Sequence, residues 1–268
     1  MDHCSTCVGT KDFSKERFIK QKNMKNLHSL TLAQIVNSNH KAATIFEKYH
    51  LDFCCKGKRL LEVACSEQQL ALSQVEEELR NVFAKQEKEL IDFDKMNLTQ
   101  LCDYILQTHH AYVKNEMPQI YAYLQKVSSK HGERHPEFYK IFQIFIAVKE
   151  EMVGHMKKEE LILFPRIKEL EKLVDYENGQ LQLNIGYLQS PITVMEHEHD
   201  HAGDQMNDIR ILSNDYTPPA DACTTYRLSF AALKAFEFDL HQHVHLENNI
   251  LFPKAIEKFK ELKLTVLN

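Results

Sequence analysis

The sequence is poor in glycine and proline, with seven of each among its 268 residues. Most tight turns draw on these two residues, so their scarcity favours long helices over many short strands. The sequence also has no apolar run near the roughly 18 residues that a membrane span requires. Its first residues lack the apolar core of a signal peptide. We therefore expect a cytoplasmic protein with no membrane segment.

A basic charge surplus and a disulfide framework are also missing. The 33 Lys and Arg are outnumbered by 38 Asp and Glu, which gives a net charge of −5. No basic surface dominates, so we expect no nucleic-acid partner. The seven cysteines are an odd number, and Cys54 and Cys55 are adjacent, which makes a poor disulfide framework. We expect these thiols to be reduced, as is usual in the cytosol.

The sequence is rich in histidine, with 15 residues, and some of them belong to a repeated His–Glu unit. The stretch HMKKEELILFP begins at His155, and the similar stretch HVHLENNILFP begins at His243. In each copy a glutamate, Glu159 or Glu247, follows the histidine by four residues. A Phe-Pro pair follows at the end of each copy. This spacing places histidine and glutamate on one face of a helix.

Apolar residues at helical spacing predict four long helices in the second part of the chain. The predicted helices cover residues 98–128, 136–173, 187–213 and 219–261. Turn-like sequences, SSKHGERHP, DYENGQ and NDYTPPAD, separate them. We expect a mobile extension at 1–25, a small helical domain at 26–85, a linker at 86–97 and a helical bundle at 98–262.

Each long helix has an apolar stripe that polar side chains interrupt at one level. The interrupting residues are His110 in the first helix, His155 and Glu159 in the second, His199 in the third, and His243 and Glu247 in the fourth. The second stripe continues to Ile162. Five other histidines lie off the stripes, and we expect them on the flanks or in solvent: His109, His197, His201, His241 and His245.

The separations between these histidines predict how the helices are arranged. In an antiparallel pair, residues at equal height lie equally far from the connecting turn. The positions midway between His110 and His155, between His155 and His199, and between His199 and His243 all fall inside the three turn-like sequences. The sequence therefore predicts an all-α fold with an up-down-up-down four-helix bundle, which brings the six polar side chains to one level.

Six polar side chains at one level of a core predict a metal site. A single histidine on an apolar face is usually a hydrogen-bonded core residue. Four imidazoles and two carboxylates together would cost several kcal/mol per buried charge, and a cation offsets that cost. One tetrahedral zinc ion cannot use six ligands, and the stripes offer no thiolate. Two bridging carboxylates with two histidines per ion suit two iron ions with an oxo or hydroxo bridge, and manganese is the alternative.

Several segments resemble the repair-of-iron-centres proteins of the YtfE, ScdA and DnrN group. They are THHAYVKNEMPQI, HMKKEELILFP, PITVMEHEHDHAG, TPPADACTTYR and HVHLENNILFP, with IFEKYHLDFCCKGKRLLEVAC upstream. They occur in the family's order over residues 28–259. The resemblance implies a hemerythrin-like bundle with a non-haem di-iron centre, preceded by a small Cys-Cys domain. The family's motif ligands correspond to the same six residues that the stripes select.

The sequence departs from the family pattern at the paired cysteines. Where the family has Cys-Cys-Gly-Gly, this chain has Cys54 and Cys55 followed by Lys56 and a glycine. The lysine either changes the local turn or, through its charge, favours the reactive thiolate. An N-terminal Cys-x-x-Cys motif, Cys4 to Cys7, is a weak signal for metal or redox chemistry.

Cys54 and Cys55 have two interpretations, as ordinary thiols of a small domain or as an exchange site. As an exchange site they would accept iron, receive nitrosyl groups or pass electrons to the metal centre. Adjacent cysteines on a regular element point in different directions, so shared ligation of one metal would need a distorted backbone. We therefore expect exchange rather than a closed structural metal site.

The resemblance implies repair of iron–sulfur clusters damaged by nitric oxide or other small oxidants, with the damaged proteins as partners. Iron donation and an enzymatic nitric-oxide reduction both need only a redox-active di-iron pair, so the residues leave them open. A hemerythrin-type dioxygen or iron sensor and a di-iron oxidase or peroxidase are the alternatives. Monomer and homodimer are equally compatible with the sequence.

Overall fold

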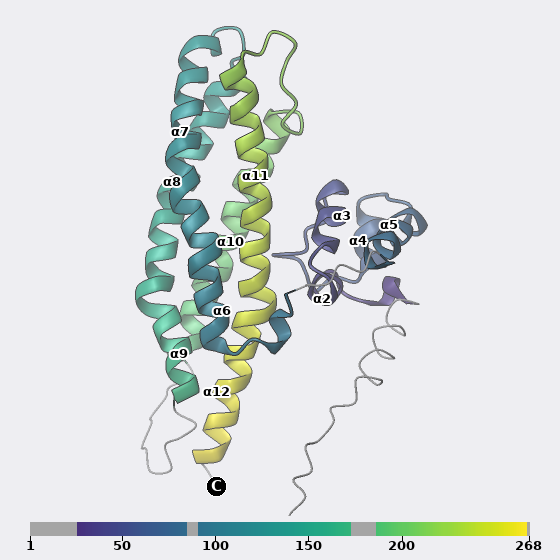
Figure 1. The fold of residues 1–268 in the computed structure, drawn as a ribbon, viewed down its shortest axis with the longest axis vertical. Helices are drawn as coiled ribbons and strands as arrows, with labels where there is room; N and C mark the ends of the chain where they lie inside the picture. The colour runs from purple at the N-terminus through teal and green to yellow at the C-terminus, as the bar shows by residue number, and fades with distance from the viewer. Residues whose placement is uncertain (1–25, 85–90, 173–185, 267–268) are drawn as a thin grey trace, which may run out of the picture. The chain divides into compact units, whose positions relative to one another are not determined.

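The protein is described here from a computed structural model that covers residues 26–84, 91–172 and 186–266. Within these ranges the chain forms helices and no strand, apart from one isolated bridge between Thr31 and Leu60 (Figure 1). The all-α prediction is confirmed. In the same ranges no helix combines the length and the apolar character needed to cross a bilayer. The expected extension at 1–25 and residues 86–90 of the expected linker lie outside them.

The described residues divide into two compact units. Residues 26–51 and 58–84 belong to the first unit, whereas residues 52–57 belong with residues 91 onward to the second. The segment that contains Cys54 and Cys55 is therefore part of the second unit, although the small domain expected from the sequence covered it.

The first unit consists of short helices around a small apolar core. Its elements are η1 (Leu27–Ser29), α2 (Leu32–Ser38), α3 (Ala42–Lys48), α4 (Leu61–Glu67) and α5 (Leu72–Ala84). Helix α2 begins with a capping box in which Thr31 and Gln34 satisfy each other's backbone N–H groups. The carboxylate of Glu78 on α5 accepts hydrogen bonds from Lys48 and Tyr49 and so ties α5 to α3.

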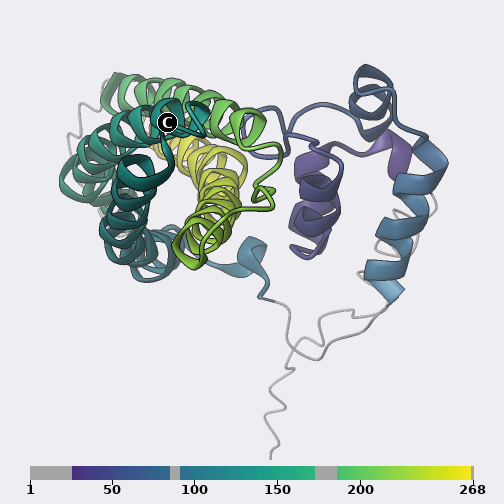
Figure 2. The same ribbon diagram turned by 90° about the horizontal axis from the view of Figure 1, so that it is seen from above.

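The second unit is a bundle of four rods, three of which are built from successive helical segments. In chain order the segments are η2 (Phe93–Lys95), α6 (Leu98–Ile105), η3 (Leu106–His110), α7 (Ala111–His131), α8 (Glu137–Lys158), η4 (Glu159–Leu163), α9 (Phe164–Lys172), α10 (Gly186–Leu212), α11 (Thr224–Leu246), η6 (Glu247–Leu251) and α12 (Phe252–Val266). Successive rods run in opposite directions (Figure 1). Helix α7 packs on α8 and α11, and α10 packs on the same two helices, so the four surround a common centre (Figure 2).

The breaks between the rods agree with the turn-like sequences where the structure describes them. The first rod ends at His131 and the second begins at Glu137, within SSKHGERHP. The third rod ends at Leu212, and NDYTPPAD follows with three consecutive left-handed residues from Asn214 to Tyr216. DYENGQ lies outside the described residues. Short connections of this kind join antiparallel neighbours, as the sequence predicts.

Three of the rods contain a π-helical turn, η3, η4 or η6. In two of them a proline, Pro165 or Pro253, lies two residues after the turn. Proline has no N–H for the carbonyl four residues back, and its ring crowds that carbonyl. The wider π turn relieves this crowding. The repeated Phe-Pro pair therefore gives a physical reason for η4 and η6, but η3 has no such proline.

The π turn η4 moves the apolar stripe of the second rod by one residue. The stripe predicted from the sequence continues from Glu159 to Ile162, but Ile162 is 44% exposed. Leu163 is buried in its place, at 1% exposure. The prediction for Ile162 is wrong because a π turn contains one more residue than the α-helical turn that the stripe assumes.

The polar level of the bundle lies between two apolar layers. On one side an aromatic layer includes Phe138, Phe145 and Tyr226, whose rings are fully buried. On the other side Leu101, Phe164, Phe252 and further residues of α6, α9, α10 and α12 form one cluster. Apolar packing on both sides excludes water from the level between them and fixes its side chains in place.

Two glycines offer a matched test of this packing. A Cβ on Gly132 would lie 2.3 Å from the ring of Tyr139 and 2.5 Å from the Ser128 carbonyl oxygen, whereas a Cβ on Gly154 would meet nothing within 4 Å. We expect Gly132→Ala to lower the free energy of unfolding by about 1–3 kcal/mol. Gly154→Ala, within helix α8, should raise it by about 0.5–1 kcal/mol. Urea unfolding measures both changes. Equal effects would contradict the tight turn at Gly132.

Candidate metal centre

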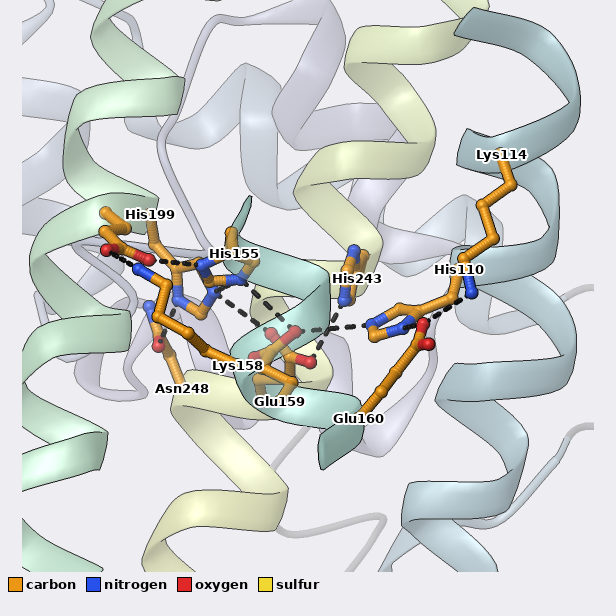
Figure 3. A network of polar contacts seen from close by, with 11 residues as sticks. His110, Lys114, His155, Lys158, Glu159, Glu160, His199, His243 and Asn248 are labelled. Carbon is orange, nitrogen blue, oxygen red and sulfur yellow. Dashed lines mark hydrogen bonds and ion pairs between the residues drawn. The ribbon is translucent and has the colours of Figure 1, made fainter. Parts of the chain in front are cut away.

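The structure brings the six predicted side chains into one buried cluster. His110 ends the π turn η3, and Glu159 and Glu247 begin η4 and η6. His155 and His243 lie in the last turns of α8 and α11, and His199 lies inside α10. None of the six is more than 3% exposed. Figure 3 shows Glu159 between one pair of imidazoles, His155 and His199, and the other pair, His110 and His243.

Glu247 faces one histidine of each pair with a different oxygen. Its Oε1 lies 3.0 Å from Nε2 of His243, and its Oε2 lies 3.0 Å from Nε2 of His199. A carboxylate in this position can give one oxygen to each of two neighbouring cations. Glu247 is therefore suited to bridge two metal ions.

Glu159 also connects the two pairs, but through a single oxygen. Its Oε2 lies 3.3 Å from Nε2 of His110 and 3.3 Å from Nε2 of His155. As a result, two groups of four potential ligands share both glutamates, and the ligand atoms within each group lie within 4.8 Å of one another. One group contains His110 and His243, and the other contains His155 and His199.

Several polar atoms at the centre of this cluster have no hydrogen-bond partner. They are Nε2 of His110, both carboxylate oxygens of Glu159 and Oε2 of Glu247. Buried polar atoms normally have partners, and leaving them without any costs about 1–3 kcal/mol each. Imidazole nitrogens and carboxylate oxygens are ligands that iron accepts. The residues present therefore fit a pair of such cations.

The ionisation states of the cluster residues also favour a bound cation. Burial disfavours the ionised carboxylate of Glu247, but the charge of His243 and the close contact with His199 hold its pKa well below its usual range. The pKa of Glu159 is also lowered, because its contacts with the histidines outweigh burial and repulsion from Glu247. Burial likewise opposes the charging of His155, yet Glu159 and Glu247 raise its pKa to about 9. Two ionised carboxylates thus occupy a buried site, which cations would stabilise.

Three residues that the sequence analysis missed orient the imidazoles. Nδ1 of His110 lies 2.8 Å from Glu160, Nδ1 of His155 lies 2.9 Å from Glu198, and Nδ1 of His199 lies 2.9 Å from Asn248. Such contacts direct Nε2 of each ring towards a metal and make it a better ligand. Each of the three is adjacent in sequence to one of the six cluster residues. That adjacency was the available signal, but the sequence does not show which ring each one contacts.

Lysines continue two of these contacts towards the surface. Lys114 donates to the same Glu160 oxygen that His110 contacts, at 2.6 Å, and Lys158 donates to Glu198 (Figure 3). Each positive charge favours the ionised form of its glutamate, and the pKa values of both glutamates are lowered although burial opposes the shift. These charges hold the outer glutamates in the form that accepts the imidazole N–H.

The structure corrects the expectation for two of the off-stripe histidines. His109 and His245 are buried, at 4% and 3% exposure, rather than in solvent. Nδ1 of His109 lies 2.9 Å from Asp239, and Nδ1 of His245 lies 3.4 Å from the Phe53 carbonyl oxygen. Neither belongs to the two four-residue groups. These partners come from segments distant in sequence, so helical spacing could not reveal them.

The other three off-stripe histidines lie where the sequence indicates. His197 and His201 are exposed, and His241 is partly exposed on the flank of α11. His201 contacts Glu151 on the neighbouring helix at 2.8 Å, outside the buried cluster.

The paired cysteines form a second group of polar side chains. Cys54 is buried and Cys55 is partly exposed, and their Sγ atoms lie 3.8 Å apart. The charge of Lys56 could favour a reactive thiolate, but the pKa of Cys54 is raised well above its usual value. The hydrogen bond with Cys55, burial and the nearby Asp52 carboxylate cause this shift. The Cys54 thiol therefore stays protonated at neutral pH.

The remaining cysteines do not join either group. Cys65 and Cys102 are buried thiols and Cys223 is an exposed one. Cys4 and Cys7 lie outside the described residues.

Two known families match the chain. The family described as the Hemerythrin HHE cation binding domain matches residues 103–255, which contain all six cluster residues. A domain of unknown function called ScdA_N matches residues 28–82, which contain Cys54 and Cys55.

Relatives that align with most of the chain come from bacteria. The chain is 34% identical over 228 residues to a protein named probable iron-sulfur cluster repair protein from Haemophilus influenzae, with 85% of this chain and 96% of the relative covered. It is 33% identical to the proteins named iron-sulfur cluster repair protein YtfE from Musicola paradisiaca and Escherichia coli O157:H7. Each of these alignments covers 84% of this chain and 96% of the relative.

We expect a histidine of the buried cluster and an exposed histidine to differ in their effect on metal binding. His199 belongs to a four-ligand group, so His199→Ala should lose at least one of about two bound irons. His201 is exposed on the same helix, and His201→Ala should keep the full iron content. Iron per chain, measured after anaerobic loading and gel filtration, tests the assignment. Equal losses from both variants would show that the wrong face of α10 was chosen.

Removal of metal should destabilise the bundle. Cations that bind the folded chain at 1,000 times their dissociation constant add about 4 kcal/mol of stability. For a chain of this size, that corresponds to a melting temperature about 10 °C higher in the loaded protein than after chelation. Circular dichroism melting of the two forms measures the difference. Identical melting temperatures would contradict a cation at the buried carboxylates.

Proposed function

Because the chain belongs to the hemerythrin-like family of iron–sulfur cluster repair proteins, we propose that it restores damaged iron–sulfur clusters with iron held at the six-residue cluster. The observation that carries this proposal is the pair of four-ligand groups that share Glu159 and Glu247. Each group offers two imidazoles together with the shared carboxylates, which suits two iron ions side by side. Manganese accepts the same ligands and is the alternative metal.

Each protein group has a distinct task in this centre. The four Nε2 atoms and the two carboxylates would hold the ions, and the outer partners Glu160, Glu198 and Asn248 keep three of the rings directed inwards. The apolar layers on both sides keep bulk water away. Two irons bound there would supply both a redox couple and exchangeable metal.

Iron donation is the repair activity that the geometry supports best. Each four-residue group would offer an ion two imidazole nitrogens and the oxygens of the two shared carboxylates. Neither group contains a thiolate. Because both carboxylates are shared, neither group encloses one ion with ligands of its own. Damaged iron–sulfur proteins offer thiolates, which are softer ligands that iron–sulfur chemistry selects. Iron would therefore pass from the nitrogen and oxygen ligands of this chain to the thiolates of a client protein. Nitric-oxide processing at the same centre is the competing activity.

We assign the paired cysteines to the exchange step. Cys54 and Cys55 are the adjacent thiols of the described residues, and they belong to the same compact unit as the metal cluster. The expected partners are iron–sulfur proteins with damaged clusters, whose cysteines bind iron as thiolates. Cys54 and Cys55 offer the same kind of ligand. The cysteines would act as acceptors between the centre and the client.

A repair assay tests the proposal directly. The iron-loaded protein should restore the activity of an iron–sulfur hydratase that has lost iron to peroxide, with no free iron added. His199→Ala should lose most of this activity, and His201→Ala should keep it. A parallel arm measures the consumption of nitric oxide. Rapid consumption of nitric oxide with no restoration of the hydratase would favour the competing activity over iron donation.

The paired cysteines should be dispensable for the centre but not for repair. We expect Cys54→Ser/Cys55→Ser to keep the iron content and the optical spectrum of the bundle while repair slows at least several-fold. Cys223→Ser changes an exposed thiol in another part of the bundle and serves as the control. Repair at the parental rate by the double variant would reduce the paired cysteines to a structural role.

A further inference from the structure

The segment Asp52–Gly57 gathers three potential metal ligands at one point. Oδ1 of Asp52 lies 3.4 Å from Sγ of Cys54, and the two sulfur atoms of Cys54 and Cys55 lie 3.8 Å apart. The ligand atoms of all three residues lie within 4.8 Å of one another. These residues are separate from the six of the buried cluster.

These distances agree with the edges of a tetrahedral site. With metal–sulfur bonds of about 2.3 Å, two sulfur ligands of a tetrahedral ion lie roughly 3.8 Å apart. A carboxylate oxygen at about 2.0–2.2 Å from the same ion lies roughly 3.5 Å from each sulfur. The separation of the two sulfur atoms and that between Oδ1 of Asp52 and Sγ of Cys54 are therefore already close to those that one bound cation requires.

The backbone explains why adjacent cysteines converge here. Oδ1 of Asp52 accepts hydrogen bonds from the backbone N–H groups of Cys54, Cys55 and Lys56, at 3.2, 2.9 and 3.2 Å. This bends the chain tightly around the carboxylate, as aspartate side chains often do in turns. The sequence analysis expected the two thiols to diverge, as they do on a regular element. The bend removes that obstacle to shared ligation.

Contacts with the bundle hold this segment next to the buried cluster. The side-chain amide of Asn249 donates to the Cys54 carbonyl oxygen at 2.8 Å, and Asn249 is two residues after Glu247. The Phe53 ring packs edge-on against His245, with centroids 5.6 Å apart. A methyl group on Gly203, four residues after His199, would lie 3.9 Å from Sγ of Cys55. The two helical segments next to the cysteines, α10 and η6, thus also carry His199 and Glu247, which belong to the same four-residue group.

We propose that Asp52, Cys54 and Cys55 form a second cation site, which takes iron or another thiophilic divalent cation as it leaves the His199 and Glu247 side of the centre. The proposal rests on the proposed function, because it names the acceptor in iron exchange. Each thiol that binds the cation gives up its proton to solvent, and no electron is transferred. Water or a client thiolate completes the coordination, so the site stays open to exchange.

The Cys54 thiol is buried beside a carboxylate, and the hydrogen bond with Cys55, burial and the Asp52 charge raise its pKa. A cation that binds there must therefore displace the Cys54 proton.

Cobalt(II) provides a direct probe, because thiolate ligands give it a charge-transfer absorption that nitrogen and oxygen ligands do not. Reduced, metal-free full-length protein should develop this near-ultraviolet band when cobalt(II) is added. Cys54→Ser and Cys55→Ser should each lose most of the band. Asp52→Asn keeps the backbone acceptor but lacks the charge, so it should keep the band and bind cobalt several-fold more weakly.

Two control variants separate this site from other thiols. Cys223→Ser and Cys4→Ser/Cys7→Ser should keep the full band. A band that survives in Cys54→Ser/Cys55→Ser, or the absence of any band in the parental protein, would overturn the proposal. The iron content of the Cys54→Ser/Cys55→Ser variant reports on the buried cluster independently. A protein that binds iron in the bundle but shows no thiolate band contradicts only this inference, whereas a band without iron in the bundle contradicts the proposed function.

Discussion

The bundle depends on one electrostatic constraint, the burial of two ionised glutamates at its centre. Glu159 and Glu247 are fully buried, and most of their oxygens have no hydrogen-bond partner among the described residues. Their contacts with four imidazoles offset part of the cost, and cations bound between them would offset the remainder. Apolar layers lie on both sides of this level, so the six polar side chains are surrounded by the hydrophobic core. The outer partners orient the imidazoles of this level, and the segment that contains the paired cysteines contacts the helical turn that begins at Glu247.

The π turns show how the fold accommodates that constraint. η4 and η6 begin at the two glutamates and end just before the repeated Phe-Pro pair. Each turn inserts one residue, so the glutamate faces the centre while the apolar residues beyond it, such as Leu163, still reach the core. A regular helix would have buried Ile162 in its place. Departures from α-helical geometry thus lie at the site itself, as π turns often do.

Two kinds of ligand chemistry are separated within one compact unit. The buried cluster offers nitrogen and oxygen ligands, and the segment that contains Cys54 and Cys55 offers sulfur beside one carboxylate. The first set suits iron held between rigid helices, and the second suits iron in transit towards the thiolates of another protein. Asn249 connects them, since it belongs to η6 and donates to the Cys54 carbonyl oxygen.

The sequence by itself determined the four rods and which side chains share one level, because helical periodicity and the distances to the turns are local, additive properties of the chain. Tertiary structure alone decided what surrounds that level. The contacts of Glu198 with His155 and of Asn248 with His199 join segments more than forty residues apart. The burial of His245 and the convergence of the cysteines likewise depend on a bend around Asp52 that packs on α11 and η6. Periodicity describes one helix at a time, whereas these features arise only from packing between distant segments.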